Sequence, residues 1–224
     1  MYRLPVLTDI QNELMDKLKI LSSGITNTST QYKQLAKKHW DSIAKPLDSL
    51  GEFERIFQKL SAIFESEIPV IDKKCITVMC ADNGVVEEGI SQSGKEVTLA
   101  VAKSMVLGTS SISVLCRSCA SDLMVIDMGI DSFDTDIYSM GVRNHKLMHG
   151  TNNFVKEKAM PIDISLRAIL YGIEIVENLK NKGINIIGTG EMGIGNTTTS
   201  SALSSALLNL PVTNVTGRGA GLND

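Results

Sequence analysis

From residue 68 onward, short continuous apolar runs alternate with segments of helical periodicity, and this alternation limits the fold more than any other feature of the sequence. Such runs are typical of strands buried on both faces of a parallel sheet, with helices between them. The sequence therefore predicts an α/β fold: a mostly parallel sheet with helices on both faces in a Rossmann-like, three-layer arrangement. The expected strands are residues 75–81, 123–128, 184–188 and 212–216, and the expected helices are residues 95–107, 110–119, 164–182 and 197–208.

The first 66 residues have a different pattern, because helical periodicity appears there without strand-like runs. Three residue pairs have capping-box spacing, in which a hydroxyl residue precedes a helix and glutamine or glutamate follows three positions later. These pairs are Thr8 with Gln11, Thr28 with Gln31, and Ser49 with Glu52. We expect residues 1–66 to form a small helical N-terminal layer and residues 67–224 to form the α/β domain.

The net charge of the chain is small: 22 lysines and arginines against 25 aspartates and glutamates give a formal charge of −3. The sequence contains no basic stripe, so nucleic acid is not an expected partner. No apolar run approaches the roughly 20 residues that a membrane-spanning helix needs, and the acidic N-terminal segment has no secretion-signal core. We therefore expect a cytoplasmic protein without membrane contact.

Four cysteines suit a reducing compartment. Cys75 and Cys80 share one apolar run, and Cys116 and Cys119 form a C-R-S-C pair within an expected helix. A zinc or redox site is one interpretation of that pair. Burial as small hydrophobic residues is the favoured interpretation, because redox pairs usually stand at the start of a helix. We expect no metal site and no cofactor.

The segment from Gly188 to Thr199, G-T-G-E-M-G-I-G-N-T-T-T, contains four glycines between an expected strand and an expected helix. Glycines let backbone N–H groups approach an anion, and a helix start adds free N–H donors and the positive end of a dipole. Ligands of parallel sheets bind beyond the carboxyl ends of the strands. The segment therefore predicts a loop that holds the phosphate of a small nucleotide. The binding residues expected in it are Gly190, Gly193, Gly195, Asn196 and Thr197.

Two other phosphate motifs fit this segment less well. A Walker loop needs Gly-Lys-Ser/Thr, and Asn196 stands where the lysine belongs, so ATP hydrolysis is not expected. Gly188, Gly190 and Gly193 satisfy the G-x-G-x-x-G dinucleotide pattern, but residues 212–216 contain no acidic side chain to bind a ribose. An NAD-dependent oxidoreductase is thus a less favoured alternative.

Two acidic residues of the expected ligand region have more than one interpretation. Glu191 would repel a phosphate, so we expect its carboxylate to bind a sugar hydroxyl or ring nitrogen, or to stabilise developing positive charge. The alternative is a loop residue that accepts backbone N–H groups. Asp82 ends the first expected strand, where it either contacts a ligand or forms an Asx-turn.

Several segments together resemble one enzyme family. The sequence G-E-M-G-I-G-N-T-T is similar to the signature of the nicotinate-nucleotide–dimethylbenzimidazole phosphoribosyltransferases, which build the lower nucleotide of cobalamin. Further segments match that family in order from about residue 30. They are 44–51 (A-K-P-L-D-S-L-G), 82–93 with E-V-T at 96–98, 125–130 (V-I-D-M-G-I), and 150–153 with 159–160.

The resemblance implies transfer of the phosphoribosyl group of nicotinate mononucleotide onto a ring nitrogen of a benzimidazole-type base. Nicotinate leaves and the anomeric carbon inverts. The resemblance also implies that Glu191 lies beside the reacting ring or ribose and acts in catalysis. It places Gly193, Asn196, Thr197 and Gly219 in the nucleotide site. For the base we expect Asp82, Ser93 and Met192, of which Ser93 matches a position on the family's base-pocket wall.

The family continues beyond the position that matches Asp224. A lysine that helps to bind the nucleotide phosphate and the glutamate assigned as general base both fall in that later part, so neither has a counterpart in these 224 residues. We therefore expect the α/β domain to be incomplete at its C-terminus. The alternative is a non-catalytic nucleotide-binding module, or half of a site that a partner chain completes. The family precedent implies a homodimer.

Overall fold

A computed structural model of the chain describes residues 7–219. The chain divides into two compact units. Residues Asp16–Asp72 form the helical unit, and the residues before Asp16 and from Lys73 onward form the α/β unit. The helix α1 (Asp9–Ser23) passes through the first boundary. The expected boundary between two domains at residue 66 stays a prediction.

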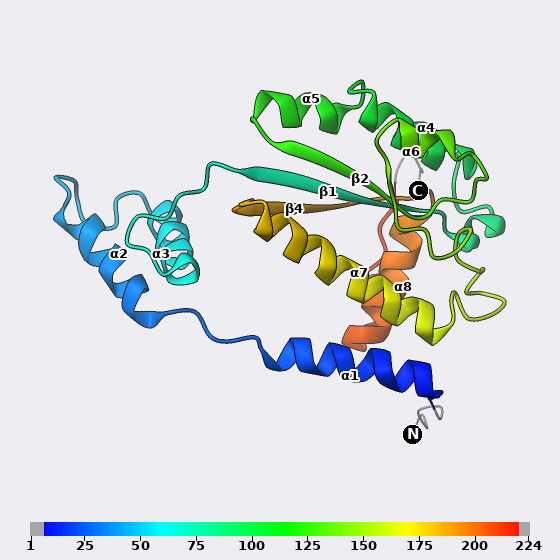
Figure 1. The fold of residues 1–224 in the computed structure, drawn as a ribbon, viewed down its shortest axis with the longest axis horizontal. Helices are drawn as coiled ribbons and strands as arrows, with labels where there is room; N and C mark the ends of the chain where they lie inside the picture. Colours follow the sequence, from blue (N-terminus) through cyan, green and yellow to red (C-terminus); the bar gives the residue numbers. More distant parts are fainter. Residues whose placement is uncertain (1–6, 220–224) are drawn as a thin grey trace. The chain divides into compact units, whose positions relative to one another are not determined.

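The α/β unit is built on a parallel sheet (Figure 1). Its described strands are β1 (Lys74–Ala81), β2 (Asp122–Gly129), β3 (Arg143–Asn144) and β4 (Ile186–Met192), and their order across the sheet is β3-β2-β1-β4. The predicted strands at residues 75–81 and 123–128 are confirmed. The sequence did not indicate β3, because its two residues are polar and exposed.

Helices cover both faces of this sheet (Figure 1). On one face, α4 and α5 pack around a buried cluster that includes Val78 and Val125. On the other face, α7 packs around Cys75 and Ile126. The predicted three-layer α/β fold is thereby confirmed. The other elements of this unit are η1 (Gly84–Glu88), α4 (Glu96–Val106), α5 (Ser111–Ser118), α6 (Asp136–Ser139), α7 (Ile162–Asn181), α8 (Asn196–Leu208) and η2 (Val212–Asn214).

The strand order contains a topological switch point between β1 and β4. The chain leaves β1 through α4 and α5 on one face to reach β2, and it later returns through α7 on the other face to β4. The carboxyl ends of β1 and β4 therefore lie side by side at this switch point. In open α/β sheets, ligands bind in the crevice outside the carboxyl ends of the strands at such a point.

Two expectations for the C-terminal part are corrected. The third strand is β4, which starts later than predicted and continues to Met192, because residues 186–192 pair in register with β1. The predicted strand at residues 212–216 is wrong: the segment forms η2. Its hydrogen bonds are satisfied locally, because Val215 N donates to Val212 O (3.2 Å) and Ser201 Oγ of α8 donates to Val215 O (2.9 Å).

The three predicted helix starts of the N-terminal region have different outcomes. The box before α1 is confirmed, with Thr8 N donating to Gln11 Oε1 (3.1 Å) and Gln11 N to Thr8 Oγ1 (3.3 Å). The cap of α2 (Thr30–Ser42) is Ser29 rather than Thr28. The box predicted at Ser49 is wrong, because α3 (Glu52–Phe64) starts after Gly51, whose φ of 57° suits glycine.

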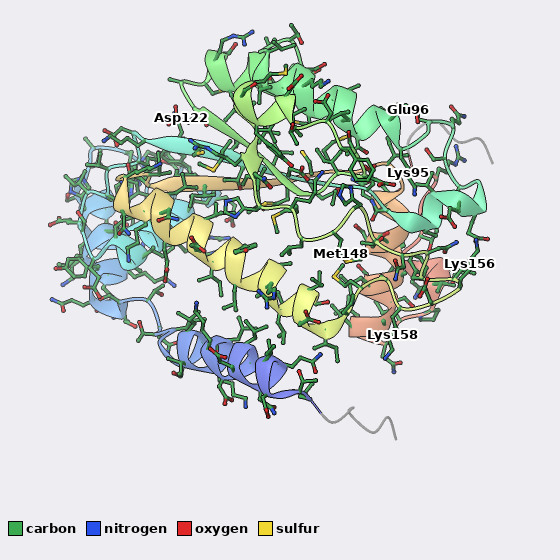
Figure 2. All side chains as sticks on the ribbon, turned by 45° about the vertical axis from the view of Figure 1, so that its right-hand side comes forward. Lys95, Glu96, Asp122, Met148, Lys156 and Lys158 are labelled. Carbon is green, nitrogen blue, oxygen red and sulfur yellow. The ribbon has the colours of Figure 1, made fainter. Side chains whose placement is uncertain are left out.

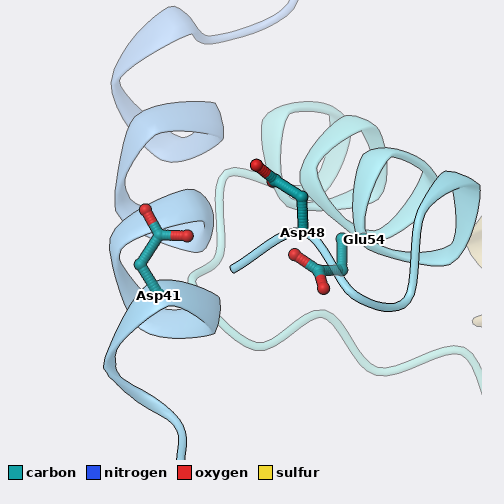
Figure 3. Close-up of side chains that lie close together, drawn as sticks. All are labelled: Asp41, Asp48 and Glu54. Atoms are coloured by element: carbon teal, nitrogen blue, oxygen red, sulfur yellow. The ribbon is translucent and has the colours of Figure 1, made fainter. Parts of the chain in front are cut away.

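Within the helical unit, α2 and α3 pack through Trp40, whose ring meets Phe53 and Phe57 edge-on at centroid distances of 5.9 and 5.3 Å. Nearby, the carboxylates of Asp41, Asp48 and Glu54 lie close together (Figure 3). Two lysines pair with this group: Lys37 with Asp41 (3.1 Å) and Asp48 (3.3 Å), and Lys45 with the buried Glu54 (2.8 Å). Of these pairs, only the one between Lys45 and Glu54 compensates a buried charge.

One described segment, Glu96–Ser118, is long and apolar enough to cross a membrane by length and composition. This finding differs from the expectation that no run approaches that length. The segment consists of α4 and α5, which are separate helices that pack on the sheet. Among the cysteines, Cys75, Cys80 and Cys116 are buried and Cys119 is exposed.

Candidate functional site

A cavity of about 630 Å³ opens at the carboxyl end of β4, beside the segment that follows β1. The loop that contains Phe154 and Lys156 contributes to this cavity through Phe154. In Figure 2, Lys156 lies on the opposite side of the α/β unit from Asp122, the residue at which β2 begins. The described lining residues are Ile90, Ser91, Phe154, residues 192–198, Ser201, Ala202, Val212 and residues 216–219. The cavity thus lies where the switch point of the sheet predicts a ligand.

The start of α8 lines this cavity. Gly195 (φ 84°) precedes the helix and, as a glycine, has no side chain with which to cap it. The first N–H groups of a helix have no partner inside the helix, and Thr197 and Thr198, which carry such groups, line the cavity. An anion bound there would accept these hydrogen bonds at the positive end of the helix dipole.

The glycine-rich loop is shorter than predicted, because Gly188 and Gly190 lie inside β4. A Cβ at Gly188 would lie 2.4 Å from Ile76 Cδ1, so this glycine makes room for packing within the sheet. Gly190 is not among the described residues that line the cavity. Its place in β4 therefore gives no support to the predicted contact between Gly190 and the phosphate. Gly193 and Gly195 form the turn and do line the cavity.

Glu191 lies near the end of the edge strand β4, and its carboxylate accepts a hydrogen bond from Asn196 Nδ2. Partial burial raises the pKa of this carboxyl, and the Asn196 amide opposes that shift. The residue as a whole is exposed. The structure therefore brings together an acid with a raised pKa, the first residue of α8 and the N–H groups of the turn.

The other predicted site residues divide into two groups. Met192, Thr197 and Gly219 line the cavity, and a Cβ at Gly219 would lie 3.1 Å from Thr197 Oγ1. Ser93 is exposed, and among the described lining residues its place is taken by Ser91. Ser93 N donates to Ser91 Oγ (3.2 Å), and the expected place of Ser93 on the wall of a base pocket stays a prediction.

Asp82 is 1% exposed and lies beneath the loops rather than among the described lining residues. Its Oδ2 accepts from Asp131 N (2.7 Å), which ties the end of β1 to the segment after β2. Its Oδ1 is buried without a partner in the described chain. Burial raises the pKa of this carboxyl, and hydrogen bonds from Thr98 and the Asp131 amide act in the opposite direction.

We expect Asp82→Asn to change how stability depends on pH. Because the folded protein holds the Asp82 proton more tightly than the unfolded chain, whose pKa is near 3.8, the free energy of unfolding falls as pH rises through the interval above 3.8. The variant lacks this titration, so its stability relative to wild type should increase between about pH 4 and pH 7. Urea unfolding across this range measures the difference, and parallel profiles would contradict the prediction.

Sequence reasoning missed the wall opposite α8. Phe154 and Ile90 supply apolar surface there. Asn153, 5% exposed, holds this wall together, because its Nδ2 donates to Glu88 Oε1 (2.5 Å) and its Oδ1 accepts from Val155 N (3.0 Å). Asn153 and Glu88 are 65 positions apart in the sequence. This wall could have been predicted only by expecting the segments around these two residues to meet in space.

The fold and the cavity bring a helix start, apolar walls and a carboxylate together at the switch point of a parallel α/β sheet, an arrangement typical of nucleotide-binding α/β proteins. A family model described as phosphoribosyltransferase (DBI_PRT) matches residues 25–224. The chain belongs to this phosphoribosyltransferase family.

Individual relatives agree with this assignment. The chain is 46% identical over 190 residues to the nicotinate-nucleotide–dimethylbenzimidazole phosphoribosyltransferase of Acetivibrio thermocellus, covering 85% of this chain and 53% of the relative. It is 44% identical over 200 residues to the enzyme of the same name from Ruminiclostridium cellulolyticum, covering 89% and 56%. The crystal structure of CobT from Thermus thermophilus superposes with a TM-score of 0.82 at 31% identity, covering 87% and 58%. The chain thus spans just over half the length of these relatives.

Proposed function

We propose that the α/β unit forms the nucleotide-binding part of the active site of a nicotinate-nucleotide–dimethylbenzimidazole phosphoribosyltransferase. The turn Gly193–Gly195 and the first turn of α8 hold the phosphate of nicotinate mononucleotide. One observation carries the proposal: in a member of the phosphoribosyltransferase family, the start of α8, which a glycine precedes, opens onto a cavity at the switch point of the sheet.

The proposed reaction exchanges one C–N bond for another. A ring nitrogen of the base attacks the anomeric carbon of the ribose, the bond from that carbon to the nicotinate nitrogen breaks, and its electron pair leaves with nicotinate. The azole loses its N–H proton to a base. A fixed phosphate holds the anomeric carbon in place, so much of the entropy cost of the reaction is met on binding.

The cavity residues supply the other requirements of this reaction. Positive charge develops on the ribose, and the Glu191 carboxylate beside the turn stabilises that charge. A flat aromatic base packs against apolar side chains. Met192, Phe154 and Ile90, which line the cavity, are the residues proposed to supply them. We also propose that the enzyme is cytoplasmic, as its sequence pattern suggests, and that it is a homodimer, as the family resemblance implies.

Incubation of the 224-residue chain with nicotinate mononucleotide and dimethylbenzimidazole tests the proposal directly. Chromatography should detect nicotinate whose release depends on both substrates. Calorimetric binding of the mononucleotide without release would favour the binding module or half-site. Absence of binding would contradict the proposed phosphate seat.

We expect Glu191→Gln to reduce turnover more than binding in a preparation that releases nicotinate. The amide keeps a polar group beside Asn196 but removes the negative charge, so kcat should fall about tenfold, equivalent to about 1.4 kcal/mol, while the dissociation constant of the mononucleotide changes little. Steady-state kinetics and calorimetry on the same variant separate the two quantities. Equal losses in both would show that Glu191 serves binding alone.

A further inference from the structure

The middle residue of the anion-binding turn, Ile194, has both of its peptide groups held by buried side chains of other elements. Ile194 N donates to Thr98 Oγ1 of α4 (3.2 Å). Ile194 O accepts from Asn83 Nδ2, at the end of β1 (3.1 Å). Thr98 is 0% exposed and Asn83 is 7% exposed, so water is a poor substitute for either partner.

Asn83 makes a second bond that extends this clamp. Asn83 Oδ1 accepts from Thr199 Oγ1 in the first turn of α8 (2.9 Å). An amide side chain can donate to the turn and accept from the helix at the same time. The clamp therefore connects the end of β1, α4, the turn and α8 through buried groups.

The turn needs such a clamp because glycine stands on both sides of Ile194. Gly193 and Gly195 have wide backbone freedom, so the two peptide planes around Ile194 are not fixed by local sterics. A preorganised anion site has its N–H groups aimed before the ligand arrives, which lowers the entropy cost of binding. With Ile194 held in this way, the turn leads into the first turn of α8, where Thr197 and Thr198 line the cavity.

We propose that Thr98 and Asn83 are positioning residues that preorganise the anion seat without touching the ligand. The inference rests on the proposed function, in which that seat binds the phosphate of nicotinate mononucleotide. The inference predicts a selective effect on affinity. Loss of the clamp weakens binding of the phosphate group and leaves binding of the nucleoside part unchanged.

The test compares nicotinate mononucleotide with nicotinate riboside, which lacks the phosphate, by calorimetry on the full chain. In Thr98→Val, we expect the preference for the mononucleotide to fall about tenfold, the effect of losing one buried hydrogen bond. Asn83→Leu should give the same selective loss and keeps the test decisive should Thr98→Val fold poorly. Thr98→Ser retains the hydroxyl and should restore the preference.

Thr77→Val is the matched control. Thr77 is a buried threonine whose hydroxyl also donates to β4, at Gly188 O (3.3 Å), but it lies away from the turn. We expect this variant to keep the preference for the mononucleotide. Equal weakening of mononucleotide and riboside in Thr98→Val and Asn83→Leu would overturn the positioning role and indicate general destabilisation.

Amide hydrogen exchange without ligand separates failure of this inference from failure of the proposed function. If the wild-type chain binds no mononucleotide, the proposed function fails. The exchange rate of the Ile194 amide then decides whether the clamp exists. Its exchange should accelerate about tenfold in Asn83→Leu, although Asn83 does not bond that N–H, because the clamp acts as one unit. Acceleration in Thr98→Val alone would overturn the inference.

Discussion

Replacing Gly193 with alanine should lower the free energy of unfolding by about 3 kcal/mol and abolish mononucleotide binding. A Cβ at this position would lie 2.0 Å from Ala81 O, a backbone atom at the end of β1. The carbonyl cannot swing aside like a side chain, because β1 is paired with β4 up to Cys80 and Met192. The turn would have to move away from the sheet, and the anion seat would move with it. Urea unfolding followed by circular dichroism, together with calorimetry, measures both effects.

Gly172→Ala is the control for this substitution. Gly172 lies inside α7, and apart from its chain neighbours and the nearby backbone of that helix, no described atom lies within 4 Å of its added Cβ. Alanine at that position should stabilise the protein by about 0.5–1 kcal/mol, because alanine restricts the unfolded chain and favours helix. Similar effects at both glycines would contradict the close packing described for Gly193.

Asp127→Ala is expected to destabilise the α/β unit by about 3 kcal/mol, because it removes the acceptor of two donors and the counter-charge of the half-buried Lys146, which keeps its bond to Ser132 O. Asp127 is 0% exposed. Its Oδ1 accepts from Ile130 N (2.8 Å), and its Oδ2 accepts from Tyr138 Oη (2.8 Å) and lies 3.4 Å from Lys146 Nζ. The pKa of Tyr138, which burial and Asp127 raise to about 12, should fall in the same variant.

Two further substitutions show whether the effect depends on the acceptor atoms. Asp127→Asn keeps one carbonyl oxygen and should cost less than the alanine variant. Asp122→Ala, on the exposed start of the same strand, should change stability by no more than about 0.5 kcal/mol. Urea unfolding of the three variants ranks them, and a loss for Asp122→Ala as large as for Asp127→Ala would refute the role of the buried network.

The sequence was a good guide where structure follows from local pattern. The buried runs that became β1 and β2 are continuous and apolar, so sheet formation buries them whatever their neighbours. The same rule failed at residues 212–216, where a β-branched segment after Pro211 instead turns back onto α8. It also misplaced the end of β4, because the glycines that allow close packing on Ile76 resemble the glycines of a loop.

The site was predictable only in its contiguous part. Residues 193–197 stand together in the sequence, and their pattern of glycine and hydroxyl residues is enough by itself to indicate an anion seat. Asn83 and Thr98 lie 111 and 96 positions from Ile194, and their polar side chains have no distinctive spacing. Their importance comes from burial and from hydrogen bonds across the fold, which a single sequence does not reveal.

Trp40, which packs edge-on against Phe53 and Phe57, determines which part of the protein intrinsic fluorescence follows during unfolding. Trp40 is the one tryptophan of the chain, and it belongs to the helical unit, whereas the cavity belongs to the α/β unit. Intrinsic emission therefore follows melting of α2 and α3, while far-ultraviolet dichroism follows both units. Transitions that fail to coincide between the two signals would show that the units unfold as separate cooperative bodies.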